Sequence, residues 1–138
     1  MIKAIQIALS GLQAASSRVA ASASNIANLS TSGALDPADG PPPYQAVTSV
    51  QSTVTDQSGE SLGVRSSVIP TNRPSVAAYD PGSPFANTDG LIGVPNVDLA
   101  EEAVNLQIAR TAYKANLKTI QTASEMQNEL LNVFDRDA

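Results

Sequence analysis

The sequence predicts a mainly α-helical protein with a small β insertion, in which long N- and C-terminal helices pack as a coiled-coil-like pair. A helical apolar repeat fills each end of the 138-residue chain, and the residues between them are rich in Ser, Thr, Pro, Gly and Asp. The length suits one domain. We divide it into an N-terminal helix over 1–29, a middle β and loop region over 30–97, and a C-terminal helix over 98–138.

The first region carries a heptad seam, in which apolar residues recur at alternating spacings of three and four. The seam runs from Ile2 to Ile26, and the remaining faces of this helix are Gln, Ser and Ala with few charges. Coiled coils that face solvent usually carry Glu and Lys beside the seam. The bland surface therefore favours contact with other helices on more than one side. The seam residues that we expect at an interface are Ile5, Leu9, Leu12, Val19 and Ile26.

The middle region contains a predicted β-hairpin. The segments "YQAVTSVQSTV" and "LGVRSSVI" alternate partly between apolar and polar residues, and "TDQSGE" between them supplies a turn. The segments "YDPGSP" and "NTDG" predict two further turns.

The last region predicts a second long helix. Asp98 is followed three residues later by Glu101, which is typical of a helix N-cap and capping box. Apolar residues lie on two opposite sides of this helix, so we expect both sides to be buried. The chain offers one other helix, so partner chains are the simplest cover, and an intramolecular two-helix core is the alternative. The expected interface residues are Leu106, Tyr113, Leu117 and Ile120 on one side, with Val104 and Ile108 on the other.

Two local patterns allow more than one interpretation. Arg110, Lys114 and Lys118 are spaced four residues apart, with Glu125 and Glu129 further on, which indicates either an interchain charge strip or a solvated face. Two asparagines near the end of the first helix, at positions 25 and 28, either end that helix or are polar surface residues.

The composition argues against catalysis. The chain has no Cys and no His, so the usual thiolate nucleophile and imidazole base are lacking. We expect no enzyme activity, no cofactor, no metal site and no small-molecule substrate. A net charge of −5 argues against nucleic acid as a partner. No apolar run is long enough to span a membrane, and polar residues interrupt the only stretch that mimics a signal peptide.

The two ends of the chain, with "ASNIAN" and "STSG" at the end of the first helix and "YKANLKTIQTASEM" in the last, resemble the axial proteins of the bacterial flagellum. Their N-terminal signature has the form S-x-x-N-x-A-N-x-x-T-x-G, and it is filled here by Ser22, Asn25, Ala27, Asn28, Thr31 and Gly33. The segment "YDPGSPFANTDGLIGVPNVD" is similar to the basal-body rod family, and most similar to its proximal rod type. The residues of that segment which carry the similarity are Tyr79, Pro81, Gly82, Pro84, Gly90, Pro95, Asn96, Val97 and Asp98.

The resemblance implies a structural subunit of the flagellar rod, which assembles with itself and with other rod subunits into a helical drive shaft. Such a shaft transmits torque from the motor to the hook. The resemblance also implies a place in the rod where it crosses the periplasm, after export from the cytoplasm without a cleaved signal peptide. The alternatives are another flagellar axial subunit of the rod or hook junction, or a free-standing two-helix adaptor that binds partner helices. A carboxylate-based glycosidase is a distant third.

Overall fold

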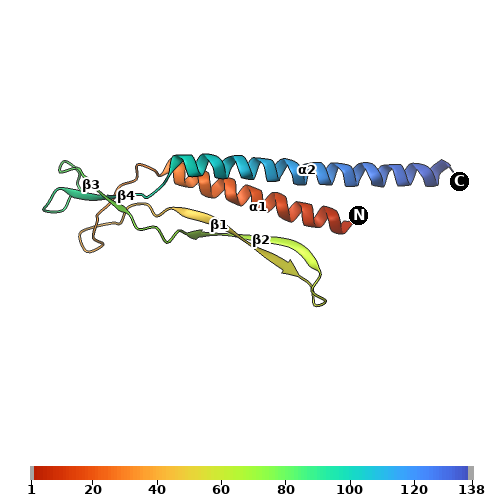
Figure 1. Cartoon of the computed structure of the whole chain (residues 1–138), viewed down its shortest axis with the longest axis horizontal. Helices are drawn as coiled ribbons and strands as arrows, with labels where there is room; N and C mark the ends of the chain where they lie inside the picture. Colours follow the sequence, from red (N-terminus) through yellow and green to blue (C-terminus); the bar gives the residue numbers. More distant parts are fainter. Residues whose placement is uncertain (1, 137–138) are drawn as a thin grey trace.

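The computed structural model describes residues 2–136 and confirms the predicted fold class. Two long helices, α1 (Ile2–Ala27) and α2 (Leu99–Arg136), enclose the strands in the chain order. The strands are β1 (Val47–Thr55), β2 (Ser61–Pro70), β3 (Val76–Tyr79) and β4 (Leu91–Val94). The helices lie side by side and run in opposite directions, and the β1–β2 hairpin lies along α1 on the side away from α2 (Figure 1).

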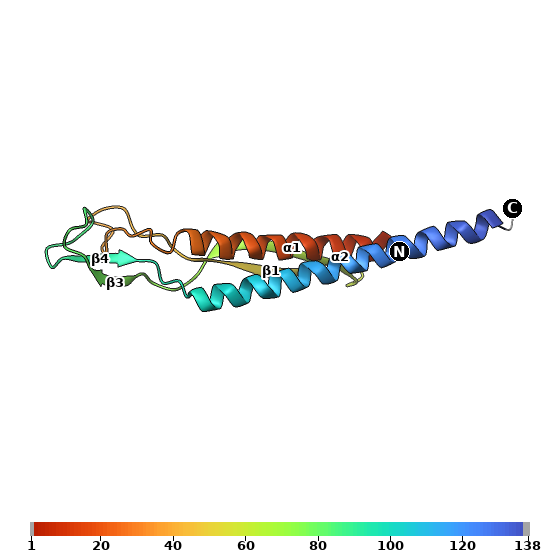
Figure 2. The same cartoon turned by 90° about the horizontal axis from the view of Figure 1, so that it is seen from above.

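Helix α2 is longer than α1. It contains 38 residues against 26, and it projects past the N-terminus of α1 in both views (Figures 1 and 2). At a rise of 1.5 Å per residue, the difference of twelve residues amounts to roughly 18 Å. We call the last twelve residues of α2, 125–136, its overhang, although the first turn of α1 still lies beside residues 126–131.

The end of α1 and the start of α2 lie at the same end of the helix pair, which we call the junction, and side chains fix both helix ends there. The Asp98 carboxylate accepts hydrogen bonds from the backbone N–H groups of Ala100 (2.8 Å) and Glu101 (3.3 Å), which confirms the N-cap. The Glu101 carboxylate does not complete a capping box, because it is paired with Arg73. At the end of α1, the Asn28 amide donates to the backbone carbonyl of Ser24 at 2.9 Å. Among the described residues only glycines have positive φ, so α1 ends through this bond without a left-handed Asn.

The contact between α1 and α2 is made by small residues. Its buried positions include Ala8, Ala15 and Ser22, which are seven residues apart on α1, and Ala109 and Ala123, which are fourteen residues apart on α2. A Cβ at Gly11 would lie 2.6 Å from Oδ1 of Asn116, so glycine lets the two backbones approach closely here. The predicted helix pair is confirmed. However, none of the large residues of the heptad seam is among its fully buried positions.

The β1–β2 hairpin confirms the sequence prediction and packs against α1. It is antiparallel, and its register runs from Val47 opposite Pro70 to Thr55 opposite Ser61. Backbone N–H of Val64 donates to Oγ of Ser10 on α1 at 3.0 Å. Gly63, with φ of 121°, lies directly against the Ser10 side chain.

The turn between β1 and β2 is organised by one carboxylate. Asp56 accepts bonds from the hydroxyl of Ser58 and from the amides of Ser58 and Glu60. The Ser58 hydroxyl, followed by the Glu60 amide, lowers the pKa of Asp56 below its ordinary value. Lys3 of α1 forms an ion pair with Glu60 beside this turn, which ties the hairpin tip to the start of the helix.

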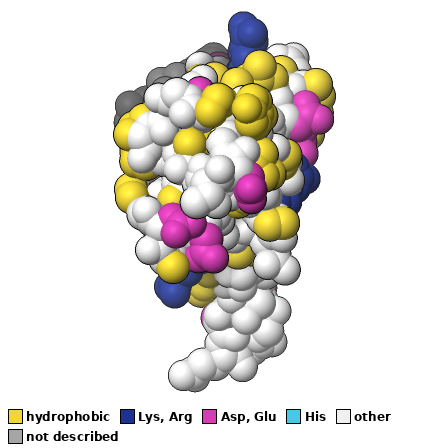
Figure 3. All heavy atoms as spheres, turned by 90° about the vertical axis from the view of Figure 1, so that its left-hand side faces the viewer, with side chains coloured by type: hydrophobic (Ala, Val, Ile, Leu, Met, Phe, Trp, Pro, Cys, Tyr) yellow, Lys and Arg dark blue, Asp and Glu magenta, His cyan; other side chains and the backbone are white. Residues whose placement is uncertain are grey.

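A second hairpin, β3–β4, lies beyond the junction end of the helices, where the sequence indicated only turns (Figure 2). Its loop is closed by the Asp80 N–H, which donates to the carbonyl of Gly90 at 2.9 Å. Gly33 joins β4 through paired backbone bonds with Gly93 of 3.0 and 2.9 Å. Hydrophobic side chains are spread over this end of the molecule, with acidic side chains among them (Figure 3).

Because the helix contact is made by small residues, we expect the stability of the chain to depend strongly on the size of the side chain at Ala109, which is fully buried. Ala109→Leu should lower the free energy of unfolding by about 1–3 kcal/mol, because a larger side chain forces the helices apart. The matched control is Ala103→Leu on the exposed side of α2. Urea unfolding followed by circular dichroism measures both. Equal stabilities of the two variants would contradict a close contact at Ala109.

Candidate assembly interface

The large apolar residues of both helices lie outside the buried part of the helix contact. Every residue expected at an interface retains solvent exposure, and none is buried. Leu9, with 49% of its surface exposed, and Val104, with 58%, are representative. The exposed members are Leu9, Val19, Ile26, Val104, Ile108, Tyr113 and Leu117, and the half-buried members are Ile5, Leu12, Leu106 and Ile120. A single chain thus places its small residues inside and offers its large residues to the outside.

Two shallow apolar grooves run along the helix pair, one on each flank of α2. Groove A, with a volume of about 560 Å³, is lined by Val19 and Ser16 of α1 and by Tyr113, Leu117, Arg110 and Lys114 of α2. Groove B, of about 610 Å³, is lined mainly by Ala4 of α1 and by Ala115, Ala123 and Met126 of α2. Grooves on two sides agree with the two apolar faces that the sequence indicated.

Asn25 holds the junction between the helices and the first hairpin. It lies within α1, and only 2% of its surface is exposed. Its amide nitrogen donates to Oε1 of Glu102 at 2.6 Å and to the carbonyl of Val47 at 2.8 Å. Its amide oxygen accepts from the N–H of Val47 at 2.8 Å and from the hydroxyl of Tyr44 at 3.0 Å. One side chain therefore connects α1, the start of β1 and the first turn of α2.

This role differs from the helix-ending role that the sequence suggested for Asn25. The helix-ending bond belongs to Asn28 alone, while Asn25 is an internal connector between elements. Neither is an ordinary surface residue, because Asn25 is buried and Asn28 is half-buried.

The other signature residues surround the same junction. Ser22 is buried on α1, one turn before Asn25, whereas Ala27 and Thr31 are exposed. The Thr31 hydroxyl donates to Oδ1 of Asn28 at 3.3 Å. Gly33 has no room for a side chain, because a Cβ there would lie against the backbone of Pro42.

The residues of the rod-type segment do not gather at this junction. Tyr79, Pro81, Gly82, Pro84 and Gly90 belong to the β3–β4 hairpin and its loop. Gly90 has φ of 73°, and a Cβ on it would lie 2.9 Å from the ring of Tyr79, which is itself 74% exposed. The remaining members, Pro95, Asn96, Val97 and Asp98, lead from β4 into α2.

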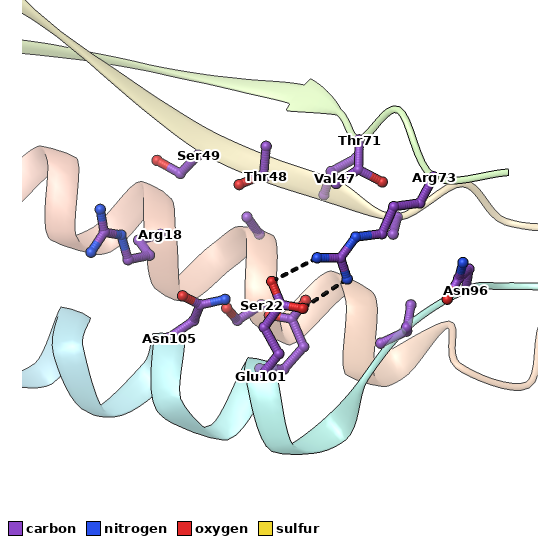
Figure 4. A pocket seen from close by; sticks show the side chains of 14 residues that line it. Arg18, Ser22, Val47, Thr48, Ser49, Thr71, Arg73, Asn96, Glu101 and Asn105 are labelled. Atoms are coloured by element: carbon purple, nitrogen blue, oxygen red, sulfur yellow. Dashed lines mark hydrogen bonds and ion pairs between the residues drawn. The ribbon is translucent and has the colours of Figure 1, made fainter.

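A polar cleft of about 310 Å³ opens beside the junction (Figure 4). On its wall the Arg73 guanidinium donates two hydrogen bonds, of 2.7 and 3.1 Å, to the Glu101 carboxylate. Hydrogen bonding to Glu101, followed by the attraction of the Glu101 negative charge, raises the pKa of Arg73. The ion pair ties the segment after β2 to the first turn of α2.

Sequence reasoning missed Tyr44, Arg73 and Glu102 as parts of the junction. Tyr44 was taken as the first residue of an alternating strand segment, and Arg73 lies in a segment without periodic pattern. Glu102 looked like one of two first-turn acids that favour the helix dipole. One pattern could have indicated that Glu102 is buried. It lies seven residues before Ala109, and therefore on the same side of α2.

The charged residues that the sequence singled out for a charge strip on α2 lie on its outer side. Arg110, Lys114, Lys118, Glu125 and Glu129 are all exposed, and within the described side chains none of them takes part in an ion pair. Across the described part of the chain, no cluster of three or more acidic, His or Cys side chains is arranged to hold a metal ion. None of the described helices combines the length and apolarity needed to cross a membrane.

The contacts of Asn25 at the junction predict that Asn25→Asp strongly lowers the stability of the chain. This change replaces a donor with a carboxylate next to Glu102, so it should destabilise the chain by about 3 kcal/mol through an unpaired buried charge. Adding Glu102→Gln should recover a large part of that loss, because the glutamine amide can donate to Asp. Urea unfolding of the two variants and of Glu102→Gln alone measures the coupling. A double variant no more stable than Asn25→Asp would contradict a direct bond.

Comparison with known proteins agrees with the two ends of the structure. Residues 5–34 match the family model described as flagella basal body rod protein, and residues 89–133 match the one described as flagellar basal body rod FlgEFG protein C-terminal. The first match covers most of α1 and the turn after it, and the second covers β4 and nearly all of α2.

Curated relatives cover almost the whole chain. The flagellar basal-body rod protein FlgC of Salmonella typhimurium is 33% identical over 136 residues, which span 96% of this chain and 97% of the relative. The FlgC of Escherichia coli O157:H7 is 32% identical over the same shares. The FlgC of Agrobacterium fabrum is 32% identical over 124 residues, or 89% of this chain and 87% of the relative. These matches confirm the resemblance: the chain belongs to the FlgC family of flagellar basal-body rod proteins.

Proposed function

We propose that this chain builds part of the proximal flagellar rod by packing the exposed faces of α1 and α2 against neighbouring subunits, in a helical assembly that transmits torque. Membership of the FlgC family makes it a structural subunit of the basal-body rod. The observation that carries the assembly proposal is the outward placement of the large apolar residues. Exposed apolar area on two flanks of a helix is costly in water, and burial between subunits removes that cost.

The proposed interface comprises the seam residues of α1 and both apolar faces of α2. In the single chain these surfaces lie on different sides of the helix pair, so one subunit can contact several neighbours at once. Contacts between unlike surfaces do not close on themselves and produce a helical filament. The relatives' name places them in the flagellar basal body, and we propose the same location, in the rod where it crosses the periplasm. Export from the cytoplasm without a cleaved signal peptide is part of the proposal.

A stiff connection between the helices and the middle region suits the transmission of torque. The Asn25 connector and the Arg73–Glu101 pair fix the strands to both helices, so force on the hairpins passes to the helix pair. The proposal involves protein surfaces only and assigns the chain no reaction, cofactor or nucleic acid. In this proposal the residues of the N-terminal signature maintain the junction between the helices and the strands. The β3–β4 hairpin and its rod-type loop are proposed to determine where along the rod the subunit lies.

The function is tested by an in-frame deletion in the source bacterium, complemented by the intact gene. We expect non-swimming cells whose basal bodies, seen by electron microscopy, lack rods and hooks. Restoration by the complementing gene excludes effects on neighbouring genes. Swimming cells with complete basal bodies would contradict the proposal and favour the two-helix adaptor.

The α1 seam is tested by Leu9→Asp in the complemented strain. A carboxylate in an interface that becomes buried on assembly should abolish swimming, because burial of an unpaired charge costs several kcal/mol. The variant should still be exported, since Leu9 is exposed in the single chain. The matched control is Gln6→Asp, which adds the same charge to an exposed polar position less than one turn away and outside the seam. A normally swimming Leu9→Asp strain would show that the seam is not an interface.

A further inference from the structure

Only the first turn of α1 reaches the overhang of α2: Ala4 lines groove B together with Met126, and Ile2 and Lys3 lie near Leu130. Three exposed apolar residues of the overhang, Met126, Leu130 and Val133, are spaced at i, i+4 and i+7, so they form one stripe along the helix. Between 48% and 57% of the surface of each is exposed. This spacing is the pattern by which an amphipathic helix lies in an apolar groove.

Groove A has the complementary shape and the complementary charge. Its apolar lining comes from Val19 of α1 and from Tyr113 and Leu117 of α2, and Arg110 and Lys114 form its basic rim. Those two cations are four residues apart on the exposed side of α2. Like charges at this spacing repel one another within a helix. Among the described side chains neither has an acidic partner.

The overhang carries the opposite charges at the same spacing. Glu125 and Glu129 are also four residues apart, they border the Met126 stripe, and neither forms an ion pair within the described residues. Glu125 follows Arg110 by 15 residues, and Glu129 follows Lys114 by the same number. A parallel α2 from a second copy, displaced by 15 residues or roughly 22 Å along the axis, therefore aligns both acidic residues with both basic residues.

We propose that the α2 overhang of one copy docks in groove A of the next copy, with Met126, Leu130 and Val133 on the apolar floor. Glu125 and Glu129 then pair with Arg110 and Lys114 of that next copy. This inference rests on the proposed assembly, and it adds the contact and the axial displacement between neighbours. Copies aligned without displacement would place like charges beside one another, which is disfavoured across an interface.

The docking explains why α2 exceeds α1 in length. With a displacement of roughly 22 Å, the overhang of one copy lies level with the part of the next copy where α1 and α2 run together. Each overhang thereby gains helix neighbours beyond the single turn of α1 that its own chain places beside it. The contact joins one end of the helix pair to the middle of the next, so it repeats from copy to copy without closing.

Charge reversal tests the pairing in the complemented deletion strain. Arg110→Glu with Lys114→Glu, and separately Glu125→Lys with Glu129→Lys, should each reduce the number of complete hook–basal bodies by about tenfold or more, because like charges then meet across the contact. The chain that carries all four reversals should recover most of the loss. Export is measured in parallel, and each variant should be exported as the intact chain is.

Cross-linking gives a second and independent reading. The chain has no cysteine, so Lys114→Cys with Glu129→Cys introduces a unique pair. In isolated basal bodies a short bismaleimide should link this variant into dimers and higher multimers, whereas either single variant should stay unlinked. Efficient linking of the single variants would place the copies in register and overturn the proposal.

The two proposals fail separately. If the deletion removes rods but both charge-reversed chains assemble normally, the docking is wrong while the rod function stands. Failure of the four-residue reversal to recover any assembly would also overturn the pairing. If the deletion leaves rods intact, the rod function itself fails, and the docking fails with it.

Discussion

The arrangement of this molecule depends on the buried amide of Asn25. A buried side-chain amide needs partners for both its donors and its acceptor oxygen, since each unmet bond costs free energy. Here the partners come from β1, from the segment before it and from α2. The amide can be satisfied only when α1, the hairpin and the first turn of α2 are correctly placed together. The Asp98 N-cap and the Arg73–Glu101 pair then hold the same turn of α2 from two further sides.

From that junction the two helices run together through small residues, and this has a consequence for the outer surface. Close approach requires Gly11, Ala15 and Ala109 at the contact, so the large apolar residues cannot lie there. They lie instead on the flanks, where a single chain leaves them exposed. A protein that had to be stable alone would reverse this order, with large residues inside and charged residues outside. The observed order fits a subunit whose neighbours complete its core.

Much of the fold was predictable, and the limits of prediction have physical causes. The helices, the N-cap at Asp98 and the β1–β2 hairpin follow from periodicity and local hydrogen bonding, which a sequence shows directly. The β3–β4 hairpin was missed because it is short and depends on the long-range bridge between Gly33 and Gly93. The connecting role of Asn25 was missed for a related reason, because its partners lie about 20 and 77 residues away. The interface residues were chosen as a coiled-coil seam. In the structure these residues are exposed or half-buried, and smaller residues make the buried contact within the chain.

The central claim is that the exposed apolar flanks are covered by neighbouring subunits, and accessibility to maleimide measures this most directly. The natural chain lacks cysteine, so single cysteines at Leu117, in groove A, and at Thr55, near the hairpin tip, report on one surface each. Both should react in the isolated chain, because both positions are exposed. In purified hook–basal bodies the cysteine at position 117 should be protected, whatever the reaction at position 55. Equal labelling of Leu117→Cys in the isolated chain and in the basal body would contradict the account.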